Sequence, residues 1–347
     1  MTALTTGSEA WWQSKNGPEW ERQKEKCRVT FWWRDPAGTQ KTSSVKRVWL
    51  YVTGVTDHHQ NARPQSLERI PDTDVWQWQG EFSPEWRGSY CFIPSVNEND
   101  FASVVFEGEQ PERMALREGW RKLLPHAVSD PLNRQSWRGG RGHAVSALEM
   151  PDAPVQPGWD RPDTPYQPPV CIEWNSERLN NRRRVWIFTT GDDGPERPLA
   201  VLLDGQFWAE SMPVWPALTS LTTGRQLPPA VYVLIDAIDM EHRSRELPCN
   251  PDFWLAVQEE LLPLVKTTAS FSDRADRTVV AGQSFGGLSS LYAGLNWPQR
   301  FGCVLSQSGS YWWPQRGAPQ AGVSAAPIAG TDILGRSRRS LGLDLRS

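Results

Sequence analysis

The sequence predicts an all-β, sandwich-like domain followed by an α/β domain, whose mostly parallel sheet is covered by helices on both faces. Three observations lead to this expectation. The chain has 347 residues, its first part carries short alternating runs, and its second part carries continuous apolar runs separated by amphipathic stretches. This length suffices for two ordinary domains, and a hydrophobic content of 38% is typical of a soluble globular protein.

The N-terminal domain is expected to span residues 1–150. Its segment Val75-Trp76-Gln77-Trp78-Gln79 alternates with period two, as a half-buried strand does. Twenty tryptophans are unusually many, and they can serve either as core or as a platform for a ligand. Core is the favoured interpretation. The runs that predict strands here are "CRVTFWWRD", "KRVWLYVTG", "VWQWQGEF", "GSYCFIPS" and "FASVVFEG".

A proline-rich segment, residues 151–170, divides the two domains. It holds seven prolines between positions 151 and 169, which excludes a helix or a central strand. We therefore expect a linker or an extended crossover.

The second domain is expected to span residues 171–316. A hairpin is predicted across the polar Asn180-Asn181 turn, and amphipathic stretches predict helices at 251–265 and 285–297. Apolar strands that alternate with such helices indicate a parallel sheet with both faces covered. The apolar runs after the hairpin are "PLAVLLDG", "AVYVLIDA", "RTVVAGQS" and "FGCVLSQS".

The last stretch, residues 317–347, fits neither domain. After Trp313 the sequence has no aromatic residue, histidine, lysine or glutamate, and it ends rich in Arg, Ser and Gly. Such a segment can bury little apolar surface, so we expect a disordered tail.

Composition excludes several classes of function. A net charge of −3 gives no broad electrostatic basis for binding nucleic acid or an anionic membrane. The start has no signal-peptide pattern, and no apolar run is long enough to span a bilayer. The five cysteines are scattered without a CxxC pair, which favours a reducing, cytoplasmic location and no structural metal.

The clearest chemical signal is Gly282-Gln283-Ser284-Phe285-Gly286, which fits G-x-S-x-G. An apolar strand enters it and an amphipathic helix leaves it, which is the context of a serine nucleophile in an α/β-hydrolase. Because the turn is tight, Gly282 and Gly286 are predicted to be sterically required. Ser284 itself is predicted to have a strained backbone.

Two backbone amides are candidates for an oxyanion hole around this nucleophile. One is the N–H of Phe285 at the start of the helix, and the other lies after "AVLLDG", near Gly205 or Gln206. Together they could stabilise the oxyanion that forms when Ser284 attacks a carbonyl group.

Four segments together resemble the enterochelin (ferric enterobactin) esterases, in the esterase-D branch of the α/β-hydrolases. They are the elbow, "VLLDGQFW", "DMEHRSRELPCNPDFW" and "FGCVLSQSGSYWWP", and the likeness runs to about Arg316. The resemblance implies a cytoplasmic enzyme that hydrolyses the ester bonds of a cyclic trilactone of dihydroxybenzoyl-serine, so that iron is released. The iron would arrive bound to the substrate, and no protein cofactor is implied.

The sequence departs from this family after the elbow. Family members continue beyond the equivalent of Trp313 with an acidic residue and a C-terminal Gly-Gly-His-Asp loop that carries the base. Here 63 residues follow Ser284 and none is histidine, while Asp332 and Asp344 have no recognisable strand before them. We expect the chain to leave the family pattern between Gln315 and Ala325, as a shifted reading frame would produce, and its activity to be impaired.

Another histidine is a candidate substitute for the missing base. His242 lies in the second domain, in a predicted loop after "AVYVLIDA", although an ordinary loop residue is the favoured interpretation. His126 and His143 would have to reach across from the first domain.

Two further groups of residues bear on substrate binding. The segment Ser308–Trp313 follows a strand and is expected to face the same cleft as Ser284, where Trp312 and Trp313 could stack on catechol rings or pack as core. The runs at 181–184 and 243–245 could supply positive charge to an anionic ferric catecholate. A solvated face, or ion pairs with Glu241 and Glu246, is the commoner outcome for such runs.

Two other classes of function stay open. A siderophore-binding protein without turnover is consistent with the missing histidine, and an acyltransferase can use the same serine. In each case the expected partner is a ferric catecholate siderophore, with no nucleic acid and no membrane insertion. The oligomeric state stays open.

Overall fold

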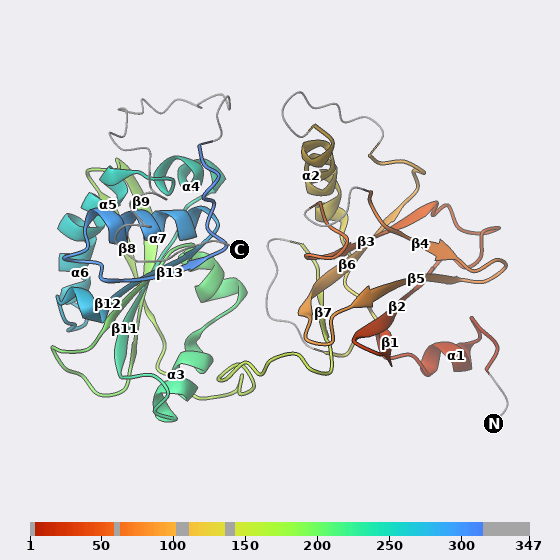
Figure 1. Ribbon diagram of the computed structural model, residues 1–347, viewed down its shortest axis with the longest axis horizontal. Helices are drawn as coiled ribbons and strands as arrows, with labels where there is room; N and C mark the ends of the chain where they lie inside the picture. The colour runs from red at the N-terminus through yellow and green to blue at the C-terminus, as the bar shows by residue number, and fades with distance from the viewer. Residues whose placement is uncertain (1–3, 59–62, 102–110, 136–142, 315–347) are drawn as a thin grey trace. The chain divides into compact units, whose positions relative to one another are not determined.

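The computed structural model describes residues 4–58, 63–101, 111–135 and 143–314. The chain forms two compact units, Met1–Val155 and Gln156–Ser347, each of which is described by itself (Figure 1). The predicted tail at 317–347 and most of the predicted strand "FASVVFEG" lie outside the described residues.

The first unit is built on a seven-stranded sheet in which each strand pairs antiparallel with its neighbours. Its order is β1-β2-β5-β4-β3-β6-β7. The strands are β1 (Glu19–Gln23), β2 (Lys26–Arg34), β3 (Arg47–Val52), β4 (Ser66–Arg69), β5 (Val75–Phe82), β6 (Arg87–Ser95) and β7 (Ser146–Glu149), with helices α1 (Glu9–Gln13), α2 (Pro111–Leu123) and the 3₁₀ turn η1 (Leu124–His126).

This sheet curls around its own core. Phe31 on β2 and Tyr90 on β6 have ring centroids 4.9 Å apart, although three strands separate them in the hydrogen-bonded order. The residues enclosed between these strands are largely apolar and include Trp33 and Trp76, each at most 6% exposed. Tryptophans in this unit therefore serve mainly as core, as the sequence predicted, and the strands form one continuous sheet.

The second unit contains a six-stranded mixed sheet in the order β13-β12-β10-β11-β9-β8. The four strands from β13 to β11 pair in parallel, whereas β9 is antiparallel to β11 and to β8. The predicted hairpin is confirmed, with Asn180 at φ 49° in its turn. The strands are β8 (Val170–Ser176), β9 (Asn181–Thr190), β10 (Leu199–Leu202), β11 (Ala230–Ile235), β12 (Thr278–Gln283) and β13 (Cys303–Gln307).

Both faces of this sheet are covered. Along β11, Val231 and Val233 face one core, while Tyr232 and Leu234 face another. The first core is closed by α5 (Pro251–Ala256), the π-helix η3 (Val257–Leu261), α6 (Leu262–Lys266) and α7 (Phe285–Asn296). The second is closed by the π-helix η2 (Phe207–Ser211) and α3 (Trp215–Thr223). Because successive side chains of β11 face two different cores, every position of this strand is buried and its sequence is continuously apolar.

The proline-rich segment has neither helix nor strand between Glu149 and Val170, as predicted. The division between the two compact units falls inside it. Within the described ranges, no helix is long and apolar enough to cross a membrane.

Candidate active site

Ser284 occupies the sharp turn between β12 and α7. Its backbone has φ 58° and ψ −118°, outside the regions that L-residues favour. The strain is held in place by hydrogen bonds from Ser284 N–H to Gln307 O and from Leu288 N–H to Ser284 O, both 3.0 Å long. A strained serine between a parallel strand and a helix is the geometry of a nucleophile elbow, as the sequence predicted.

The glycines of the elbow differ in what they permit. A Cβ at Gly282 would lie 2.4 Å from the carbonyl carbon of Gly286, so no side chain fits there. At Gly286 a Cβ would meet only ordinary contacts at 3.4 Å, whereas at Gly287 it would lie 2.7 Å from Ser306 Oγ. The second position at which a side chain does not fit is therefore 287. The prediction that Gly286 is required was wrong: the backbone of Gly286 lies close to Gly282, but a Cβ built at position 286 meets no atom closer than 3.4 Å.

The two candidate oxyanion amides both lie at helix starts. Phe285 is the first residue of α7, and Gly205 opens the helical turn that precedes η2. Amides in the first turn of a helix have no partner within the helix and can donate to a ligand. Gly205 also packs tightly against β11, because a Cβ there would lie 2.5 Å from the carbonyl carbon of Leu234.

An arginine ties these two loops together. Arg243 Nε and Nη2 donate to the two carboxylate oxygens of Asp204, at 2.6 and 2.8 Å, and Nη2 also donates to Gln283 O at 3.2 Å. Asp204 precedes Gly205 and Gln283 precedes Ser284. Arg243 therefore bridges the loop after β10 to the elbow, a contact that the sequence did not predict.

His242 has a different environment from the one predicted. It lies in the helix α4 (Met240–Glu246), not in a loop, because Asp239 caps that helix by accepting from His242 N–H at 2.8 Å. The His242 ring also contacts this carboxylate, with Nδ1 2.9 Å from Asp239 Oδ1. Hydrogen bonds from His242, first from its backbone N–H and then from its ring, hold the pKa of Asp239 below its usual value. His126 and His143 belong to the first unit.

Among the described residues, the hydrogen-bond partner of the Ser284 hydroxyl is Ser310. The two Oγ atoms are 3.0 Å apart, and Ser310 N–H donates to Ser284 O at 3.0 Å. The segment after β13 therefore contacts Ser284, on the side that the sequence predicted for Ser308–Trp313, although the individual contact was not predicted.

The two adjacent tryptophans of this segment have different surroundings. Trp312 is 53% exposed and its ring lies 5.9 Å from that of Phe285, centroid to centroid. Trp313 packs against the core of the second unit. Only Trp312 thus combines a position beside the elbow with an accessible ring.

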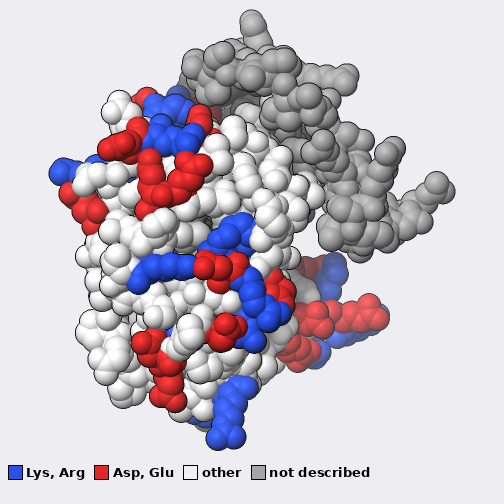
Figure 2. Space-filling view, turned by 90° about the vertical axis from the view of Figure 1, so that its left-hand side faces the viewer, with Lys and Arg blue, Asp and Glu red and all other residues white. Residues whose placement is uncertain are grey.

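The arginine runs form ion pairs rather than a free cationic surface. Arg182 pairs with Glu173, Arg184 with Glu210 and Asp236, and Arg245 with Glu241. Acidic and basic side chains are interspersed over the face of the molecule drawn in Figure 2. The ion-pair alternative is confirmed for these runs.

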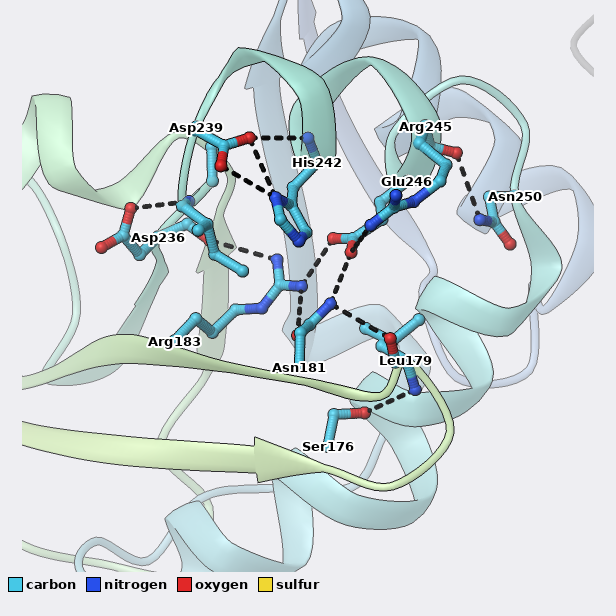
Figure 3. Close-up of polar contacts among 12 residues, drawn as sticks. Ser176, Leu179, Asn181, Arg183, Asp236, Asp239, His242, Arg245, Glu246 and Asn250 are labelled. Atoms are coloured by element: carbon cyan, nitrogen blue, oxygen red, sulfur yellow. Dashed lines mark hydrogen bonds and ion pairs between the residues drawn. The ribbon is translucent and has the colours of Figure 1, made fainter. Parts of the chain in front are cut away.

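One of these pairs is buried beneath α4 (Figure 3). Arg183 Nη2 lies 2.5 Å from Glu246 Oε2, and the two side chains are 1% and 4% exposed. Asn181 bonds to both partners, and Arg183 Nη1 donates to Asp236 O. This network fastens α4, and with it Arg243, to the start of β9.

No group of three or more His, Cys, Asp or Glu side chains suited to a metal ion occurs in the parts of the chain that the structure describes. A surface hollow of the second unit, with a volume of about 570 Å³, is not lined by Ser284. It is lined by Thr190 and the end of α3. Thr190 pairs with Ala230, the first residue of β11. The hollow therefore lies near the amino-terminal ends of the parallel strands, whereas the elbow lies at their carboxyl-terminal ends.

The strained turn at Ser284, between a parallel strand and a helix, has the geometry found in esterases that use a serine. Comparison with known families agrees: residues 28–159 match the family described as "Enterochelin esterase, N-terminal", and residues 176–330 match the family described as "Putative esterase".

Named relatives and solved structures cover most of the chain. The chain is 70% identical over 325 residues to the iron(III) enterobactin esterase of Escherichia coli O6:H1, covering 93% of this chain and 80% of that protein. It is 50% identical to the iron(III) enterobactin esterase of Dickeya dadantii, over 90% of this chain and 74% of that one. The crystal structure of ferric enterobactin esterase from Salmonella typhimurium is 69% identical, with a TM-score of 0.84, over 91% of this chain and 80% of that one. The chain belongs to the iron(III) enterobactin esterase family.

Proposed function

We propose that this protein is a serine esterase that hydrolyses the ester bonds of ferric enterobactin to dihydroxybenzoyl-serine units, with Ser284 as nucleophile. The main support for this proposal is the strained elbow at Ser284 in a chain that is 70% identical to an enterobactin esterase. A related structure from Shigella flexneri was determined in the presence of enterobactin, which supports the same substrate class here. The proposal includes an α/β-hydrolase fold for residues 171–316, a sandwich-like domain for residues 1–150, a linker at 151–170 and a cytoplasmic location.

The proposed reaction follows from the geometry of the elbow. Ser284 Oγ attacks the lactone carbonyl carbon, and its proton passes to a base. The carbonyl oxygen becomes an oxyanion that accepts hydrogen bonds from the amides of Phe285 and Gly205. Collapse of this intermediate expels the serine hydroxyl of the next unit, and water then hydrolyses the acyl-enzyme.

Trp312 is proposed as a platform for a catechol ring. Its ring is exposed beside Phe285, and Arg243 lies 5.7 Å from the centroid of the Phe285 ring, which adds positive charge near an anionic ligand. The iron enters and leaves as part of the substrate, so no resident cofactor is invoked. Replacing Trp312 by Ala is expected to weaken binding of ferric enterobactin about fivefold, measured by quenching of tryptophan fluorescence with Trp159→Ala as the exposed control.

We further propose that a polypeptide of these 347 residues alone, tested as such, is impaired in turnover. No histidine follows Ser284 in its sequence, and His242 is bound to Asp239. Loss of a triad histidine costs on the order of 10⁶ in kcat, while oxyanion donors and binding leave about 10³ over water. Imidazole added to the solution supplies a small base and is expected to accelerate hydrolysis.

Chromatography of the products tests this function against its alternatives. Ferric enterobactin is incubated with the protein and imidazole, and free dihydroxybenzoyl-serine is the expected product. Quenching of tryptophan fluorescence without product would instead identify a siderophore-binding protein. Product that forms only with an added alcohol or amine acceptor would identify an acyltransferase.

A further inference from the structure

Ser310 is attached to the nucleophile twice. Its side chain lies 3.0 Å from Ser284 Oγ, and its backbone N–H donates to Ser284 O. Together with the bond from Ser284 N–H to Gln307 O, these contacts hold the nucleophile between two residues of the β13 segment. Two hydrogen bonds therefore link Ser310 directly to Ser284.

The backbone after β13 fixes where the Ser310 hydroxyl points. Ser308 has φ 47°, which reverses the chain directly after the strand. Trp313 N–H donates to Ser310 O at 3.1 Å, and the Tyr311 hydroxyl donates to Ser306 Oγ at 2.5 Å. The loop is therefore set by its own hydrogen bonds.

The two serines differ in burial, and this difference bears on which hydroxyl donates in the hydrogen bond between them. Ser310 is 3% exposed, and among the described residues Ser284 Oγ is the acceptor within its reach. Either hydroxyl could donate in this contact, but a buried hydroxyl without an acceptor costs about 1–3 kcal/mol, which favours Ser310 as the donor. With Ser310 as the donor, the proton of the half-buried Ser284 hydroxyl is available to a base.

We propose that Ser310 is a positioning residue of the esterase, whose hydroxyl holds Ser284 Oγ in its attacking orientation and stabilises that oxygen as its proton leaves. This inference rests on the proposed function of Ser284. A hydrogen bond strengthens when its acceptor becomes charged, so the contact helps most as the alkoxide forms. Loss of such a bond is expected to lower the reactivity of the group at position 284 about tenfold.

The test replaces Ser284 with cysteine, whose ionisation can be followed without a base. The rate at which iodoacetamide alkylates the thiol at position 284 is measured against pH, using peptide mass spectrometry to separate it from the native cysteines. Combining Ser284→Cys with Ser310→Ala is expected to raise the thiol pKa by about one unit, because the thiolate loses a donor. Ser310→Thr, which keeps the hydroxyl, is expected to restore most of the effect.

Ser290→Ala provides the matched control. Ser290 is a fully buried serine of α7 whose hydroxyl donates to Gly286 O, not to Ser284. Its loss is expected to leave the thiol pKa unchanged. If Ser310→Ala does not fold, Ser310→Val against Ser310→Thr gives the same comparison between side chains of one shape.

The outcomes separate this inference from the proposed function. An unchanged thiol pKa in Ser310→Ala, or equal pKa values in the Thr and Ala variants, would overturn the role of Ser310. A raised pKa supports it even if no form of the protein hydrolyses ferric enterobactin, a result that would overturn the proposed function alone.

Discussion

The two sides of helix α4 carry arginine–carboxylate pairs with different purposes. Arg183 and Glu246 are sealed from solvent, lie beneath the helix, and are 1% and 4% exposed. Arg243 and Asp204 are 14% and 16% exposed, and Arg243 also donates to Gln283 O at the elbow. The first pair holds the helix in the fold, whereas the second shapes the site. Two arginine–carboxylate pairs of the same type are thus expected to differ in their effects, because one is buried and the other lies beside the elbow.

The largest effect on stability is expected at the buried pair. Glu246→Gln leaves the charge of Arg183 without a counter-ion and should lower the free energy of unfolding by about 3–5 kcal/mol, measured by urea denaturation. Glu241→Gln on the exposed side of the helix should change it by less than about 0.5 kcal/mol. Equal losses in the two variants would mean that the buried network does not fasten α4.

At the pair beside the elbow, the effect should fall on reactivity. Arg243→Lys keeps the charge but cannot make two parallel bonds to Asp204 and a third to Gln283 O. Imidazole-assisted hydrolysis of ferric enterobactin should fall about tenfold, because the oxyanion loops lose their alignment. Arg245→Lys, whose side chain is 46% exposed, is the matched control and should behave like the parent. If Arg243→Lys greatly lowered the stability and left hydrolysis unchanged, this pair would hold the fold together, as the buried pair does, rather than align the elbow.

The cap of α4 gives a smaller, pH-dependent effect. Because the pKa of Asp239 is lowered in the folded state from 3.8, its contribution to stability is complete above that value and is lost as the pH falls through the folded-state pKa. Asp239→Asn keeps an acceptor but carries no charge. Urea denaturation should show a gap from the parent at pH 7 that narrows at pH 3, and a gap that widens at pH 3 would contradict the assignment.

The smallest effect is expected at His242. His242→Ala retains the backbone N–H that Asp239 accepts from, so helix α4 should persist. Hydrolysis with or without imidazole should stay within about twofold of the parent. A drop to the level of Ser284→Ala would show that His242 acts as the base.

The elbow and most strands of both sheets were accessible from sequence, because they rest on local patterns. The predicted run Val75–Phe82 coincides with β5, and the turn at Ser284 lies between the predicted strand and helix. Helix α4 was missed because "MEHRSRE" has almost no apolar period; it is held by the Asp239 cap and by Glu246. The sequence signal for this helix was Asp239, a residue type that caps helices, followed by the acidic Glu241 in the first turn.

The contacts that shape the site could not be predicted. Arg243 and Asp204 are 39 residues apart, and Arg183 and Glu246 are 63 apart. Which arginine meets which carboxylate depends on the strand order, and composition cannot reveal it. The position of Ser310 at the carboxyl end of the sheet was predictable, since residues that follow parallel strands gather there, but its contact with Ser284 was not.

Imidazole rescue of hydrolysis is the decisive test of Ser284 as the nucleophile. Release of dihydroxybenzoyl-serine from ferric enterobactin is measured for the parent chain and for Ser284→Ala, with and without imidazole. The parent alone should hydrolyse the substrate slowly, and imidazole should accelerate hydrolysis by the parent but not by Ser284→Ala. Fast turnover without imidazole would overturn only the proposed impairment. Equal rates for the parent and Ser284→Ala under every condition would contradict the assignment of Ser284 as the nucleophile.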